Sequence, residues 1–277
     1  MEIHLSLPEG LSLKIGATPP DRKAYATAHL EGGGVLLDGS QSLAEEAVGF
    51  GVPVLKRGLQ AIFPGAVTVT GVQRGTTHAI TAGYTLNLVE KLSRPGAETV
   101  ENRRLYAVKD FLAAVIRRTP RLRGALTAAS SALRRIFRWE TTYAEAGFSA
   151  EVSVVSTLEE GTGTLVVTVE AAGLPADITE VVVMNEQGAH YFDRYRDSSG
   201  IRLEGKAIGC WDEVDADEAW FESRARRVAF RLGRVEGARL FRGRELVGSR
   251  LAWAGFGYAF PPALSRLRYE LKIERLA

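Results

Sequence analysis

Residues 189–197, AHYFDRYRD, concentrate the side chains of this sequence that are best suited to chemistry. One histidine, two tyrosines, two aspartates and two arginines lie within nine positions, after the apolar run ITEVVVM and the short segment NEQG. We expect an extended strand here, with side chains alternating between two faces. One face then carries Tyr191, Asp193, Tyr195 and Asp197, and the other carries His190, Phe192, Arg194 and Arg196. Neither face is typical of a buried core.

The first face suits a sugar, because a tyrosine ring stacks on the apolar side of a pyranose while carboxylates and phenols bind its hydroxyls. The second face suits a carboxylate or a phosphate. We therefore expect His190 to act as a base and Asp193 or Tyr195 to act as its acid partner. Tyr191 is then a substrate-binding residue, and Arg194 holds an anionic group of the substrate.

The same stretch is also typical of an edge strand whose charges pair across the sheet and discourage aggregation. In either case the expected alternation puts His190 beside Arg194 and Arg196. Two neighbouring cations are expected to keep the imidazole neutral and able to accept a proton, unless a carboxylate intervenes.

A second candidate base is His78, within GVQRGTTHAITAGY. Gly71 and Gly75 permit close approach to the backbone there, and Arg74 adds a cation that suits an anionic substrate group. A histidine that is hydrogen-bonded in a loop is the other interpretation. Trp211 is a candidate for stacking on a sugar ring.

Metal and cofactor sites are not expected. The histidines fall at positions 4, 29, 78 and 190, and none has a carboxylate at the spacing of zinc ligands on a helix. The acidic stretch CWDEVDADEAWFE, residues 210–222, lacks the glycine of a calcium loop, because the sixth residue from Asp212 is Asp217. It is interpreted as a solvated acidic segment.

A run of arginines within residues 117–138 contains no acidic residue. It is interpreted as a polyanion-binding surface, as a solvated helix face, or as a partner for the acids at 212–222. The net charge of the whole chain is only +2, which argues against nucleic acid as a general partner.

Hydrophobic periodicity predicts the elements that position these residues. Apolar residues alternate with polar ones over 2–16, 149–171, 228–232 and 267–273, which indicates antiparallel strands with one buried face. SLAEEAVGF, residues 42–50, is expected to be a helix with Ser42 as its N-cap and Glu45 three positions later. Apolar spacing of three and four predicts two further helices at 99–118 and 121–138.

The sequence therefore predicts a mainly β protein, an antiparallel β-sandwich or supersandwich with an inserted α-helical hairpin at about residues 98–138. The expected parts are an N-terminal β region over 1–97, the helical hairpin, and a C-terminal antiparallel β region over 139–277. The two β regions are open to interpretation as one domain.

The segments GGGVLLDG and GVPVLKRGLQAIFPG, followed by antiparallel strands to the end, resemble the galactose-mutarotase-like superfamily of carbohydrate-active β-sandwich proteins. In that resemblance Gly51-Val52-Pro53 and Phe63-Pro64 border a sugar cleft. It implies an acid–base pair of histidine with aspartate or glutamate in a concave sheet, for which His78, His190 and Asp193 are available.

We expect a carbohydrate-binding or carbohydrate-processing protein with a small-molecule or oligosaccharide ligand, and acid–base chemistry on an acidic sugar as its activity. The alternative is a non-enzymatic β scaffold that presents the arginine-rich helical hairpin to a polyanion or a protein partner. The chain shows no signal-peptide pattern and no apolar run as long as a membrane span, so a cytoplasmic location is expected.

Overall fold

The fold is described from a computed structural model, for residues 2–16, 32–45, 47–58, 60–93, 140–247 and 251–277. These residues form a four-stranded and a 14-stranded sheet, in which neighbouring strands run antiparallel. The mainly β, antiparallel architecture is thereby confirmed. The predicted helical hairpin at 98–138 and its arginines lie outside the described residues. No helix within the described ranges is long and apolar enough to cross a membrane.

The small sheet contains the hairpin expected from the first alternating segment. Its strands are β1 (Glu2–Ser6), β2 (Leu11–Gly16), β3 (Val35–Asp38) and β4 (Gln41–Ser42). Ile3 faces Ile15 and Leu5 faces Leu13 in the register of β1 and β2. Glu9 and Gly10 both have positive φ, which makes the tight turn between the two strands.

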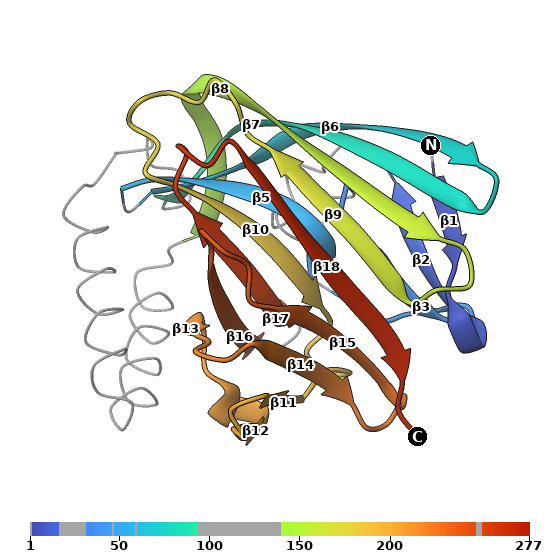
Figure 1. Ribbon diagram of the computed structural model, residues 1–277. Helices are drawn as coiled ribbons and strands as arrows, with labels where there is room; N and C mark the ends of the chain where they lie inside the picture. The colour runs from blue at the N-terminus through green and yellow to red at the C-terminus, as the bar shows by residue number, and fades with distance from the viewer. Residues whose placement is uncertain (1, 17–31, 46, 59, 94–139, 248–250) are drawn as a thin grey trace.

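The large sheet joins strands from both sides of residues 94–139. In sheet order the strands are β12 (Arg202–Glu204), β11 (Arg194–Asp197), β14 (Glu218–Ser223), β15 (Val228–Gly233), β18 (Arg266–Arg275), β9 (Thr164–Glu170), β8 (Glu140–Glu159), β7 (Thr77–Ser93), β6 (Gln60–Arg74), β5 (Phe50–Arg57), β10 (Glu180–Gln187), β17 (Leu251–Phe260), β16 (Arg239–Val247) and β13 (Asp212–Glu213) (Figure 1). Because β7 pairs with β8, the N-terminal and C-terminal β regions share one sheet.

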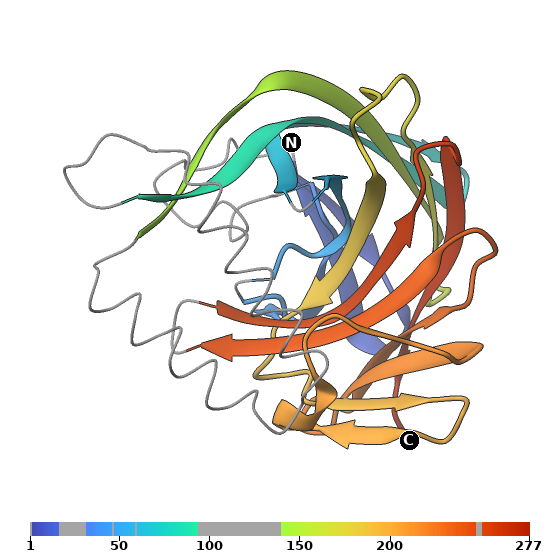
Figure 2. The same cartoon turned by 90° about the vertical axis from the view of Figure 1, so that its left-hand side faces the viewer.

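This sheet curves strongly, and strands β1 and β2 lie within the curve (Figure 2). Aromatic rings from its two halves meet in the core: Phe256 of β17 lies 4.8 Å from Phe221 of β14, and Tyr258 lies 4.8 Å from Tyr269 of β18, between ring centroids. Full burial of such side chains stabilises the fold by about 1.5–3 kcal/mol each. The aromatic core therefore holds the two halves of the sheet together.

The predicted helix at 42–50 is wrong. After β4 the chain forms a loop, and Glu45 and Gly49 have φ values of 51° and 86°, which are incompatible with a right-handed helix. Leu43 and Val48 are buried. The apolar spacing thus reflects side chains that enter the core from a loop.

The expected strand over 189–197 is also corrected. Residues 188–192 form a turn, in which the N–H groups of Tyr191 and Phe192 both donate to the carbonyl of Gly188. Only Arg194–Asp197 is a strand, and it pairs with β12 and β14 rather than with β10. Phe192 and Tyr195 are almost fully buried, so the expectation that this stretch contributes nothing to the core is wrong.

Candidate functional site

The end of β10 contacts the loop formed by residues 43–45 and 47–49. The N–H of Gly188 donates to the carbonyl of Leu43 at 2.7 Å, and the N–H of Glu186 donates to the carbonyl of Gly49 at 3.0 Å. Two main-chain hydrogen bonds therefore fix this loop against the turn at 188–192. The loop in this way places Glu45 beside His190.

Glu45 and His190 form a carboxylate–imidazole pair. Oε1 of Glu45 lies 2.8 Å from Nδ1 of His190, and its Oε2 accepts the backbone N–H of the same residue at 3.1 Å. Gly188 permits this approach, since a Cβ at that position would lie 2.5 Å from Oε2. The side chain of His190 is 56% exposed and that of Glu45 only 22%. When Nδ1 donates its proton to Glu45, Nε2 carries a lone pair that can accept another.

A cation lies behind the same turn. Arg244 of β16 donates from Nη2 and Nε to the carbonyl of Ala189, at 2.8 and 3.2 Å. Burial lowers the pKa of Arg244, while the nearby carboxylates of Asp193 and Glu45 raise it. Its guanidinium is therefore charged at neutral pH, and it brings positive charge to the His190 turn.

Tyr191 presents an aromatic ring and a phenol next to His190. Its hydroxyl accepts a hydrogen bond from Nε2 of Gln41 at 3.1 Å, and the guanidinium carbon of Arg226 lies 5.5 Å from its ring centroid. Asp193 is exposed on the same segment. The turn thus combines a base, a carboxylate, an aromatic ring and polar groups that can bind hydroxyls.

Glu186, four residues before His190, is a buried carboxyl group. It is 2% exposed, and its Oε1 has no hydrogen-bond partner. Burial raises the pKa of Glu186 to about 8; a backbone hydrogen bond from Val48 opposes the shift and the charge of Glu245 adds to it. Glu186 is therefore mainly protonated at neutral pH.

The residues of β11 have structural partners. Tyr195 is 2% exposed, its hydroxyl donates to Oδ2 of Asp197 at 2.7 Å, and burial raises the pKa of this phenol. Arg194 is paired with Glu204 at 2.8 Å. The predicted strand would put His190 on one face with Arg194 and Arg196. In the structure Arg194 pairs with Glu204 instead, and the partner of His190 is the carboxylate of Glu45.

The other predicted site residues lie on other elements. His78 of β7 pairs with Gln73 of β6 and Leu158 of β8, and Arg74 is exposed at the adjoining turn. Trp211 stacks on Trp253 with 5.1 Å between ring centroids. His190, Tyr191 and Asp193 thus lie on one short segment because they are close in the sequence, and the remaining candidates lie on other elements.

Sequence reasoning missed Glu45, Glu186 and Arg244. The apolar spacing predicts a helix for Glu45, although the glycines at 49 and 51, shortly after it, favour a loop. Glu186 carries a clear signal, a charged residue two positions after the apolar run of a buried strand. Nothing in the local sequence marks Arg244. Within the described ranges, no group of three or more His, Cys, Asp or Glu side chains is arranged to hold a metal ion.

Comparison with known proteins identifies the fold. No protein-family model matches the chain, and no curated protein matches it in sequence. The α-N-acetylgalactosaminidase NagBb from Bifidobacterium bifidum matches with a TM-score of 0.54 and 10% identity in its Gal-NHAc-DNJ complex, and with 0.52 and 12% in its GalNAc complex.

Both matches cover 100% of this chain and 36% of the galactosaminidase, so the chain spans about a third of that enzyme's length. A galactose mutarotase-like protein from Clostridium acetobutylicum also matches, with a TM-score of 0.39 and 11% identity over 99% of this chain and 95% of the other. The chain shares its β fold with one part of the galactosaminidase.

Proposed function

We propose that this chain binds a carbohydrate at the turn formed by residues 188–193 and performs acid–base chemistry on it, with His190 as the proton-transferring group. The observation that carries the proposal is the pair of Glu45 and His190, at 2.8 Å, with an imidazole that is 56% exposed. A carboxylate that holds Nδ1 fixes the ring orientation and leaves Nε2 for the substrate.

In the proposed step, Nε2 of His190 accepts the proton of a sugar hydroxyl. The imidazolium that forms is stabilised by the carboxylate of Glu45, as in other carboxylate–histidine pairs. Arg244 supplies positive charge near the developing oxyanion. Proton transfer by a positioned side chain contributes about 10²–10⁴-fold to a rate.

A carbohydrate suits the surroundings of His190. Tyr191 offers a ring for the apolar side of a sugar, and Gln41, Arg226 and Asp193 offer donors and acceptors for hydroxyls. The shared fold with a galactosaminidase supports the same ligand class. The activity of that enzyme belongs to a chain almost three times longer, so it supports the ligand class and not a particular reaction.

The first experiment is a thermal-shift screen against neutral and uronic mono- and oligosaccharides at millimolar concentration, because saturating binding raises the melting temperature. For the sugar that stabilises the protein, His190→Gln is expected to reduce turnover by about a hundredfold or more, with the melting temperature within a few degrees of the wild type. His78→Gln, on the β6–β7 hairpin, serves as the matched control and is expected to retain activity.

Two results would contradict the proposal. One is the absence of stabilisation by any sugar in the screen. The other is a destabilised His190→Gln variant whose activity per folded molecule equals that of the wild type, since His190 would then be a packing residue.

A further inference from the structure

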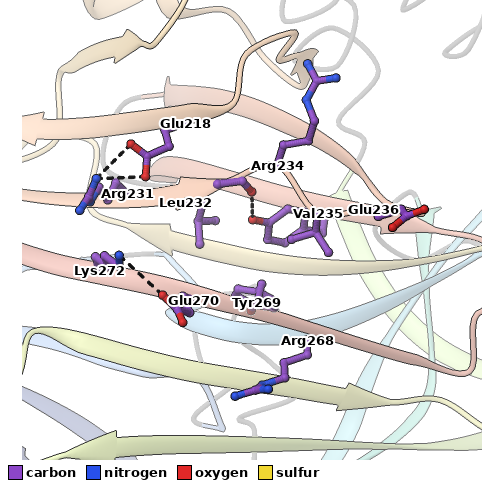
Figure 3. A pocket seen from close by; sticks show the side chains of 12 residues that line it. Glu218, Arg231, Leu232, Arg234, Val235, Glu236, Arg268, Tyr269, Glu270 and Lys272 are labelled. Atoms are coloured by element: carbon purple, nitrogen blue, oxygen red, sulfur yellow. Dashed lines mark hydrogen bonds and ion pairs between the residues drawn. The ribbon is translucent and has the colours of Figure 1, made fainter.

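A hollow lies on the outer face of the large sheet, and its lining includes no residue of the His190 turn. It has a volume of about 490 Å³ and opens over β14, β15, β18 and the segment 233–236 (Figure 3). This volume lies within the range of about 300–1,000 Å³ that is usual for ligand sites. We call it the outer hollow.

The walls of the outer hollow carry charges of both signs in fixed pairs. Nη1 of Arg231 donates to both carboxylate oxygens of Glu218 at 3.1 Å, and Nζ of Lys272 lies 3.6 Å from Glu270. Nε of Arg231 is buried without a hydrogen-bond partner. Charged side chains of this kind bind hydroxyl groups with their remaining donors and acceptors, whereas an apolar ligand would remove the ion pairs from water without compensation.

Arg268 differs from the other cations of the outer hollow. It is exposed on β18, and no carboxylate of the described chain forms an ion pair with it. In Figure 3 it lies across the hollow from Arg231 and Glu218. A guanidinium without a counter-ion binds a planar or tetrahedral anion in two-point geometry, so Arg268 selects for an acidic group.

The outer hollow continues past Arg268. A second depression of about 330 Å³ over β8 and β9 shares this arginine, and Thr157 and Thr168 line it with hydroxyl groups. Two hollows that meet at one side chain favour an extended ligand over a single ring.

We propose that the outer hollow is a second binding site, for a saccharide chain that carries an acidic group, with Arg268 binding the acid and the pair of Arg231 and Glu218 binding hydroxyls. This site is independent of the acid–base chemistry proposed for His190. It fits an oligosaccharide because its walls are polar and nearly balanced in charge, with one uncompensated cation.

Isothermal titration calorimetry with a tetramer of galacturonic acid tests the proposal, with the neutral galactose tetramer as the comparison ligand. We expect the acidic tetramer to bind more tightly, because only it has a carboxylate for Arg268. Arg268→Ala is expected to weaken its binding by about tenfold or more, as the loss of a charge-assisted hydrogen bond implies. Arg202→Ala, which removes an exposed arginine of β12 outside the hollow, is the matched control and is expected to retain full affinity.

His190→Gln separates the two proposals, because its affinity for the acidic tetramer at the outer hollow is expected to equal that of the wild type. The proposal is overturned if the wild type does not bind the acidic tetramer, if Arg268→Ala binds it unchanged, or if Arg202→Ala weakens binding equally. Arg268 is exposed, so its variant is expected to fold, which circular dichroism checks.

Discussion

Residues 189–193 and 194–197 are consecutive in the chain, yet their polar side chains have different roles. In the first segment the exposed imidazole of His190 has one ring nitrogen beside Glu45 and the other free for a ligand. In the second, the carboxylate of Asp197 accepts hydrogen bonds from Tyr195, Ser199 and the N–H of Ile201, and is 7% exposed. A polar group whose bonds are all made within the fold stabilises it, whereas one with an unused atom is available for chemistry.

The largest expected effect concerns Glu186, just before the first segment. Its pKa is raised by burial from 4.5 to about 8, so the native state keeps a proton that the unfolded chain loses. The stability of the wild type should therefore fall as the pH rises from about 4.5 to 8, by roughly 1.4 kcal/mol for each pH unit. Glu186→Gln removes this titration, and its stability relative to the wild type should increase by about 3–5 kcal/mol between pH 5 and 9.

Urea denaturation of both proteins across this pH range measures the difference. Subtracting the two curves cancels every other titrating group. A difference that does not change with pH would show that Glu186 has the same pKa in the folded and the unfolded protein. The carboxylate of Glu186 would then be stabilised by hydrogen bonds within the fold, like that of Asp197 in β11.

The second prediction contrasts the two aspartates of the stretch. Asp197→Ala leaves the buried hydroxyl of Tyr195 and two backbone N–H groups without acceptors, so the free energy of unfolding should fall by about 3 kcal/mol. Asp193→Ala, at an exposed position, should change it by less than about 0.5 kcal/mol. Equal losses in the two variants, measured by urea denaturation, would contradict the division between the segments.

Acid titration sharpens this contrast. Burial alone would raise the pKa of Asp197, but hydrogen bonds from Ser199, Tyr195 and the N–H of Ile201 outweigh it and lower the pKa below its usual value. The stability that Asp197 contributes is therefore complete above the unfolded value of about 3.9 and is lost as the pH falls below it.

Much of the fold was predictable from period-two alternation. Leu267, Tyr269, Leu271 and Ile273 are buried in β18 as the pattern indicated, and the alternating segment 2–16 forms the antiparallel strands β1 and β2. These predictions hold because the alternation of apolar and polar residues within a strand shows directly which of its faces is buried and which is exposed to solvent.

The candidate site was less predictable because its contacts are distant in sequence. Glu45 and His190 are 145 residues apart, and no local pattern records that a loop will bring them together. Tyr195 and Phe192 are buried by rings of β15 and β17, such as Phe230 and Phe256, which lie far outside these nine residues. Polar composition therefore identified the region but not its conformation.

The smallest expected effect tests whether Glu45 acts through His190. Glu45→Gln keeps an oxygen that can accept the Nδ1 proton, so the ring should stay in place, but it removes the charge that stabilises the imidazolium. For the sugar found in the screen we expect kcat to fall by about tenfold, equivalent to about 1.4 kcal/mol, with KM unchanged. That loss is smaller than for His190→Gln because the proton acceptor itself remains.

Glu160→Gln, in the β8–β9 turn, is the control. An unchanged kcat with a lowered melting temperature would show that Glu45 only stabilises its loop. The polar residues of the His190 turn would then have a structural role, as those of β11 do.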